Sequence, residues 1–130
     1  MLTGSCLCGT VTYVITGPVG PSYYCHCSIC RKVSGAGFTA NAVVKLPDFA
    51  FTSGQSFVKS YLMGENVNRE FCSKCGTPIR VTQGSEMRLR MGTIDRGEPA
   101  APSMHIFVGS KANWDSITDS LPAHEAGVQA

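Results

Sequence analysis

The seven cysteines of the chain form three tight clusters, and thiols grouped in this way are typical ligands of a metal ion. The clusters are Cys6 and Cys8, then Cys25, Cys27 and Cys30, then Cys72 and Cys75. We expect the chain to stay in the cytosol, which keeps thiols reduced, so its odd number of cysteines favours metal binding over disulfides. The sequence therefore predicts thiolate metal sites.

The first and last clusters together predict one closed site. Cys72-Ser-Lys-Cys75-Gly76 has the form of a knuckle, with two thiols on a tight turn. Cys6 and Cys8 would project to the same side of an extended segment. Four thiolates suit tetrahedral zinc, although iron accepts the same ligands. We expect a structural role, because a closed site has no position for a substrate.

The middle cluster brings three thiols within six residues. Three protein ligands leave one tetrahedral position open, as a catalytic zinc requires. The alternative is a second structural site with His26 or His105 as fourth ligand, and spacing alone favours neither. His26 lies between two ligand positions on an extended segment, so we expect its side chain to point away and to make a hydrogen bond.

The residues around the middle cluster offer few further groups. Arg31 and Lys32 follow it directly and are candidates for holding an anionic substrate or lowering thiolate pKa values, although a basic pair after a turn is often only solvated. His26 is the one candidate acid or base near the cluster in sequence. The three cysteines are expected to hold metal rather than to act as nucleophiles. An open site should lose its metal more readily than a closed one, with a Cys–Cys bond as its oxidised form.

The elements that must position these residues are mainly β-strands. Alternating or β-branched patterns predict strands in the segments Cys8–Thr16, Tyr23–Cys27, Phe38–Lys45, Phe57–Leu62, Val67–Cys72 and Met87–Met91. The best helical candidate is a short segment, Lys111–Ile117, with Ser110 as N-cap. The sequence therefore predicts a mainly β protein of antiparallel sheets with at most one or two short helices.

Length and composition predict a single domain. The chain has 130 residues and a mass of 13.8 kDa, and 43% of its residues are hydrophobic. Its formal net charge of +2 is too small to indicate a nucleic-acid surface, and no stretch is apolar enough to span a bilayer. We expect a cytoplasmic domain over residues 1–130, with a core over about 3–122 and a frayed tail over 123–130.

Four segments of the chain together form a specific pattern: Gly4–Tyr13, Cys25–Lys32, Phe71–Gly76 and a late segment from Met104 to Pro122. They resemble the glutathione-dependent formaldehyde-activating enzyme family, to which centromere protein V is related. Single zinc knuckles are unspecific, whereas four matching blocks in order are highly specific. The resemblance covers roughly residues 3–122.

The resemblance implies a β-tent fold, shared with Rab-exchange zinc proteins and methionine sulfoxide reductase B. It also implies two zinc ions, a structural one on Cys6, Cys8, Cys72 and Cys75 and a labile one on Cys25, Cys27 and Cys30. The reaction of the family is the condensation of formaldehyde with glutathione to S-(hydroxymethyl)glutathione, classed with carbon–sulfur lyases. We therefore expect a lyase or synthase that joins formaldehyde, or a related small aldehyde, to glutathione or another small thiol.

Two other functions compete with this expectation. The first is a non-catalytic, zinc-stabilised binding module for a protein partner, for which centromere protein V and the relatives that contact small GTPases are precedents. The modest net charge and the lack of a basic tail count against it. The second is methionine sulfoxide reduction, which needs a redox-active cysteine outside the metal ligands. All seven cysteines are already assigned to metal.

Overall fold

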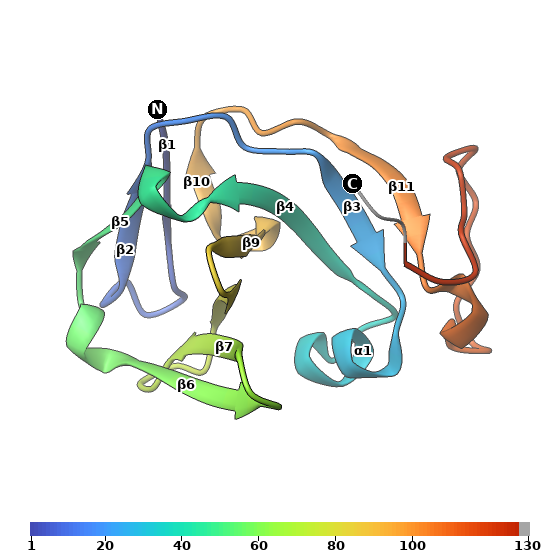
Figure 1. The fold of residues 1–130 in the computed structure, drawn as a ribbon, viewed down its shortest axis with the longest axis horizontal. Coiled ribbons are helices and arrows are strands. Elements are labelled where there is room, and N and C mark those ends of the chain that lie inside the picture. Colours follow the sequence, from blue (N-terminus) through green and yellow to red (C-terminus); the bar gives the residue numbers. More distant parts are fainter. Residues whose placement is uncertain (128–130) are drawn as a thin grey trace.

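The computed structural model describes residues 1–127, and these form a mainly β structure with two sheets and one α-helix (Figure 1). Strands hold 44% of the residues, and the sheets do not close into a barrel. The predicted fold class is confirmed. Within this described part of the chain, no helix combines the length and the apolar character that crossing a bilayer requires.

The smaller sheet has four strands in the order β10-β1-β2-β5. Their bounds are β1 Leu2–Ser5, β2 Thr12–Ile15, β5 Phe49–Ser53 and β10 Ile94–Arg96. All its pairs are antiparallel. The strand expected from Cys8 to Thr16 is shorter than predicted, because Cys6 to Gly9 form a turn in which the Gly9 N–H donates to the Cys6 carbonyl.

The larger sheet has seven strands in the order β11-β3-β4-β9-β8-β7-β6. Their bounds are β3 Ser22–Cys25, β4 Thr39–Lys45, β6 Val58–Met63, β7 Val67–Cys72, β8 Pro78–Gln83, β9 Glu86–Arg90 and β11 Pro102–Ile106. The hairpin predicted over residues 57–72 is present as β6 and β7. One pair departs from the expected antiparallel arrangement, since β11 runs parallel to β3.

One hydrophobic core joins the two sheets. Tyr13 and Ile15 of β2 pack in the same buried cluster as Val44 of β4 and Met87 and Leu89 of β9. These side chains are almost fully buried, and burial of each contributes about 1.5–3 kcal/mol. In the strand predicted over residues 87–91, Met87 and Leu89 therefore face the core.

The α-helix lies where the sequence pattern did not predict one. Helix α1 spans Ser28–Ser34 and begins directly after Cys27, whose sulfur accepts a hydrogen bond from the Cys30 N–H. It ends at Gly35, which has a left-handed φ of 67° and donates its N–H to the Arg31 carbonyl. Seven residues are too few to show a helical hydrophobic period.

The helix predicted for Lys111–Ile117 is wrong. A 3-10 turn occupies Val108–Ser110, and the chain after it is irregular. The Lys111 ammonium donates to the carbonyls of Ala112 and Asp115. The Lys111 side chain thus satisfies two backbone carbonyls of this short segment by hydrogen bonds, and the segment does not form a helix.

The tail is ordered further than expected. Ala123 forms a bridge with His105, and the His124 N–H donates to the His105 carbonyl. Backbone hydrogen bonds also join Phe107 to Ala126 and Gly109 to Glu125. Fraying is therefore wrong for residues 123–126, while residues 128–130 lie outside the described part of the chain.

Candidate metal centres

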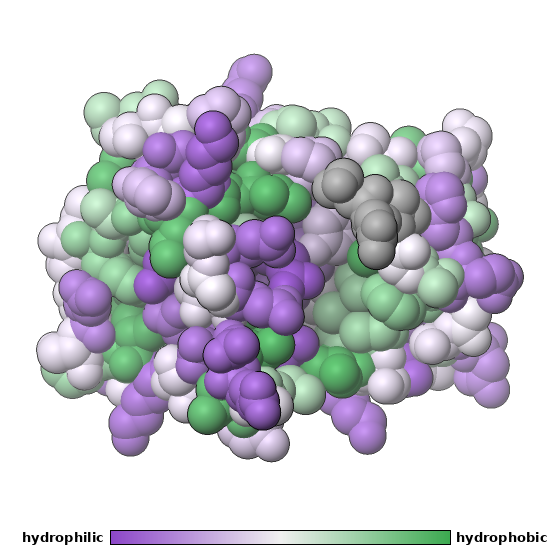
Figure 2. All heavy atoms as spheres, in the orientation of Figure 1, coloured by the Kyte–Doolittle hydropathy of each residue, from purple (hydrophilic) through white to green (hydrophobic). Residues whose placement is uncertain are grey.

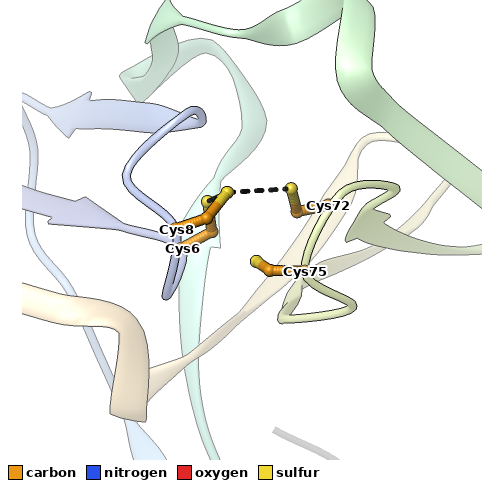
Figure 3. Close-up of side chains that lie close together, drawn as sticks. All are labelled: Cys6, Cys8, Cys72 and Cys75. Carbon is orange, nitrogen blue, oxygen red and sulfur yellow. Dashed lines mark hydrogen bonds between the residues drawn. The ribbon is translucent and has the colours of Figure 1, made fainter.

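The first and last cysteine clusters meet as one group of four (Figure 3). Cys6 and Cys8 lie in the turn between β1 and β2, and Cys72 and Cys75 lie at the end of β7 and in the turn before β8. The Sγ atoms of Cys6 and Cys8 are 3.6 Å apart, and those of Cys8 and Cys72 are 3.9 Å apart. All four sulfurs lie within 4.8 Å of one another.

These distances fit a tetrahedral zinc ion. With a zinc–sulfur distance of about 2.3 Å, the edge of the tetrahedron is about 3.8 Å. The two sulfur–sulfur separations of 3.6 and 3.9 Å lie on either side of this value. The four residues present therefore match a closed thiolate site for zinc in both number and spacing.

Both halves of this group are turns that glycine makes possible. Gly9 has φ 77° and Gly76 has φ 82°, a left-handed conformation that favours glycine. The Gly76 N–H donates to the Cys72 carbonyl, just as the Gly9 N–H donates to the Cys6 carbonyl. The extended geometry expected for Cys6 and Cys8 is thus wrong, and their pair is a second knuckle.

Hydrogen bonds to sulfur favour the thiolate form in this group. The Val11 N–H donates to Cys6 Sγ over 3.3 Å. Thr77 Oγ1 accepts the Leu7 N–H and lies 3.2 Å from Cys75 Sγ, within reach to donate its proton to the thiolate. This hydroxyl lowers the pKa of Cys75 to about 5, whereas burial raises the pKa of Cys72. Sequence reasoning missed Thr77, which lies only two residues after a ligand position.

The middle cysteines form a group of three. Cys25 is the last residue of β3, Cys27 caps α1, and Cys30 lies in the first turn of α1. Their sulfurs also lie within 4.8 Å of one another, and Cys27 is partly exposed while the other two are buried. Among residues 1–127, no histidine, aspartate, glutamate or further cysteine joins this group. The structure thus divides the seven cysteines into the predicted four and three.

His26 and His105 make a hydrogen bond with each other and belong to neither group. His26 Nε2 lies 2.8 Å from His105 Nδ1, and His105 Nε2 lies 3.0 Å from both carboxylate oxygens of Asp119. In the tautomer of His105 that carries its one proton on Nε2, this nitrogen donates to the carboxylate, Nδ1 accepts, and His26 donates. Burial lowers the pKa of His26, so the neutral form is favoured. The hydrogen bond predicted for His26 is confirmed, and its partner could not be read from the sequence.

A buried polar chain lies beside the three cysteines. Arg90 Nη1 donates to Asn41 Oδ1 over 2.5 Å, and Asn41 Nδ2 donates to Thr39 Oγ1 over 2.8 Å. Thr39 pairs with Cys25 across the β3–β4 ladder. All three are at least nine-tenths buried. Sequence reasoning missed this chain, because alternation along β9 puts Arg90 on the face opposite the core residues Met87 and Leu89.

The polar chain stabilises negative charge on Cys30. The pKa of the Cys30 thiol is lowered to about 5, mainly by a hydrogen bond from Cys25. Hydrogen bonds from Thr39 and Cys27 and the positive charge of Arg90 lower it further. Burial opposes this effect. A thiolate at Cys30 therefore has both a hydrogen-bond donor and a cation beside it.

Two cavities adjoin this region between α1 and the larger sheet. One has a volume of about 250 Å³ and the other of about 350 Å³, and Val33 of α1, Pro78 and Arg90 line both. Figure 2 shows hydrophilic side chains gathered at the centre of the face drawn in Figure 1, with more hydrophobic ones on either side. Arg31 and Lys32 lie in the last turn of α1, and neither lines these two cavities. Their predicted contact with substrate stays a prediction.

Known proteins resemble the chain in sequence and in fold. The family model described as glutathione-dependent formaldehyde-activating enzyme matches residues 1–110. A protein of Halomonas elongata named "putative glutathione-dependent formaldehyde-activating enzyme" is 29% identical over 127 residues, covering 90% of this chain and 81% of that protein. A crystal structure of a Rhodobacter sphaeroides protein superimposes with a TM-score of 0.63 at 21% identity, over 75% of this chain and 91% of that one. The last likeness bears on the fold alone.

Proposed function

The chain belongs to the glutathione-dependent formaldehyde-activating enzyme family, and from this we propose that it is a zinc-dependent carbon–sulfur lyase that also runs as a synthase. It would join formaldehyde, or a related small aldehyde, to glutathione or another small thiol. The observation that carries the proposal is the group of three cysteines without a fourth protein ligand among the described residues. Arg90 lines two nearby cavities, and Thr39, which pairs with Cys25, lines one of them.

The two cysteine groups have different parts in this proposal. Cys6, Cys8, Cys72 and Cys75 would hold a structural zinc, which joins the turn after β1 to the turn after β7. Cys25, Cys27 and Cys30 would hold the second zinc, with the partly exposed Cys27 on the side that substrates reach. A zinc ion with an open position can take up the thiol as its thiolate or polarise the aldehyde oxygen.

The reaction itself is an addition. The thiol sulfur forms a bond to the carbonyl carbon, the second bond of the carbonyl becomes a lone pair on oxygen, and the proton lost by the thiol ends on that oxygen. The reverse reaction breaks the carbon–sulfur bond and returns the proton. No oxidant or reductant is needed.

The residues around the three cysteines supply charge balance and order. Three thiolates carry more negative charge than one divalent ion neutralises, and buried uncompensated charge is costly. Arg90 supplies a buried positive charge beside Cys30, and Asn41 and Thr39 fix its position through the hydrogen bonds given above. These residues would keep the group preorganised for its metal.

The test compares zinc content and catalysis in two variants. Wild type should hold two zinc ions per chain and accelerate exchange between formaldehyde and S-(hydroxymethyl)glutathione in nuclear magnetic resonance spectra. Cys27→Ser should stay folded with one zinc and lose the acceleration, whereas Cys75→Ser should unfold, because it opens the closed site. Ser73→Ala, an exposed change between two ligands, serves as control and should match wild type.

Two results would overturn the proposal. Undiminished exchange in Cys27→Ser would remove the three-cysteine group from the reaction. A folded wild type with two zinc ions and no acceleration, with glutathione or other small thiols, would instead favour the non-catalytic binding module.

A further inference from the structure

The 250 Å³ cavity has walls that carry an excess of positive charge. Arg69 and Glu70 of β7, Arg80 of β8 and Arg90 of β9 line it, and Val33 of α1 faces them. Among its lining residues there are thus three arginines and a single carboxylate. An ordered anion in this cavity would meet a favourable field.

Glu70, the one carboxylate among the residues that line the cavity, already pairs with Arg80. Arg80 Nε and Nη2 donate to the two oxygens of Glu70 over 3.1 and 3.2 Å, a bidentate pair in which both side chains are largely buried. Arg80 also lies over the rings of Phe49 and Phe51, which fixes its guanidinium. Glu70 therefore balances Arg80, and Arg69 has no carboxylate partner among the residues that line the cavity.

Arg69 lacks good partners. Its Nε donates to the Met63 sulfur, a weak acceptor, over 2.9 Å. Its Nη1 is buried and has no hydrogen-bond partner among residues 1–127. A buried donor without an acceptor costs about 1–3 kcal/mol, and more when it is charged. Such a group in a native structure is explained when a ligand supplies the acceptor.

Arg69 of β7 and Arg90 of β9 line the same cavity, so one anion there can interact with both. Arg90 also donates to Asn41, which donates to Thr39, and Thr39 pairs with Cys25 across the β3–β4 ladder. The cavity and the three-cysteine group are therefore neighbours.

The shape of the donors and the chemistry of the proposed substrate together indicate the class of anion. A guanidinium presents its N–H groups as a planar fork that matches the oxygens of a carboxylate or a phosphate, and of these two groups glutathione carries only carboxylates. The volume of about 250 Å³ is below the 300–1,000 Å³ usual for a whole ligand of drug size, so the cavity suits one end of a molecule. The other end of that molecule would reach the cysteines.

We propose that Arg69 and Arg90 bind a carboxylate of the thiol substrate, and so make the enzyme selective for carboxylate-bearing thiols over neutral ones. This inference rests on the function proposed for the adjacent three-cysteine group. It names two specificity-determining residues on β7 and β9, far in sequence from the three-cysteine group of Cys25, Cys27 and Cys30.

The test measures binding without chemistry. The probes are S-methylglutathione, whose blocked sulfur cannot react with an aldehyde, and its dimethyl ester, which lacks both carboxylates. Isothermal titration calorimetry gives Kd for each probe with wild type, Arg69→Gln, Arg69→Lys and the control Lys45→Gln. Lys45 is exposed at the end of β4, so its variant makes the same change of charge outside the cavity.

Wild type should bind the acid at least 10-fold more tightly than the ester. Arg69→Gln should weaken binding of the acid by about 10- to 100-fold, as expected for a charged hydrogen bond, and leave binding of the ester unchanged. Arg69→Lys should fall between, because it keeps the charge and loses the fork. Lys45→Gln should match wild type, and thermal unfolding checks that every variant is folded.

Equal binding of acid and ester by wild type would overturn the inference, and so would an equal loss of both in Arg69→Gln. Failure of the proposed function has a different signature. If no exchange is catalysed but binding of the acid still depends on Arg69, the carboxylate site stands and the lyase activity does not. If exchange is catalysed with no preference for carboxylate-bearing thiols, the activity stands and the carboxylate site does not.

Discussion

His26 Nε2 lies 2.8 Å from His105 Nδ1, and this contact ties the segment between two candidate metal ligands to β11. The His26 backbone N–H also donates to the Ile106 carbonyl over 3.0 Å. Both rings are almost fully buried. The position of the three cysteines therefore depends on a strand that lies about 80 residues further along the chain.

Removal of the His105 imidazole should destabilise the protein. His105→Phe keeps a ring but leaves the buried His26 N–H without an acceptor, which should lower the free energy of unfolding by about 1–3 kcal/mol. Asp119→Asn should cost less than about 1 kcal/mol, because the Asp119 side chain is 44% exposed. Urea denaturation measures both, with His124→Gln as an exposed control. Equal losses in the two variants would contradict the argument.

The two metal sites should empty in order when a chelator is added. The group of three offers fewer protein ligands, and Cys27 is partly exposed, so its zinc should leave first without loss of structure. The zinc of the group of four should leave only as the protein unfolds. Released zinc and far-ultraviolet circular dichroism are followed together. Loss of both ions in one step with unfolding would contradict the assigned roles.

A methyl group at Gly4 should destabilise the smaller sheet. A Cβ there would overlap the ring of Tyr13 on the adjacent strand β2, and that ring is 2% exposed and cannot move aside. Gly4→Ala should therefore cost about 1–3 kcal/mol or more, as overpacking does. Gly92→Ala has open space and no left-handed φ, so it should change the stability by less than about 0.5 kcal/mol. Chemical denaturation measures the free energy of unfolding of both variants, and equal losses in the two would contradict this prediction.

The stability of the protein should fall at alkaline pH through Tyr13. Burial raises the pKa of Tyr13 to about 12 from its ordinary 10, and its hydroxyl lies 2.7 Å from Thr93 Oγ1. Below pH 10 the tyrosine is protonated in both states, and its contribution is complete. Between pH 10 and 12 only the unfolded state ionises, which removes about 2–3 kcal/mol. The free energy of unfolding should therefore drop less with pH in Tyr13→Phe than in wild type, under reducing conditions. Parallel pH profiles would refute this.

The division of the cysteines and the mainly β fold could be predicted because their signals are local. Two cysteines close together on a turn followed by glycine, as at Cys72 and Cys75, specify a knuckle without knowledge of the rest of the chain. Alternating side chains on β9 specify a strand in the same way. The hairpin of β6 and β7 has its turn between two adjacent patterned runs.

The surroundings of the three cysteines could not be predicted, because they depend on the order of strands. Arg90 meets Thr39 and Asn41 only because β9 pairs with β4, and His105 meets His26 only because β11 runs parallel to β3. Helix α1 was missed for a different reason, since its seven residues carry no hydrophobic period. Gly35 after the basic residues Arg31 and Lys32 was the one signal of its end.

The contact between Cys8 and Cys72 closes a loop of 64 residues. Fixing the ends of a loop of that length costs about 4 kcal/mol of chain entropy. During translation at about 5–20 residues per second, the first knuckle leaves the ribosome roughly 3–13 s before its partner is made. Cys6 and Cys8 therefore stay reduced and without their partner thiols until residue 75 leaves the ribosome. Assembly of the four-cysteine group is thus a late event in the biogenesis of the protein.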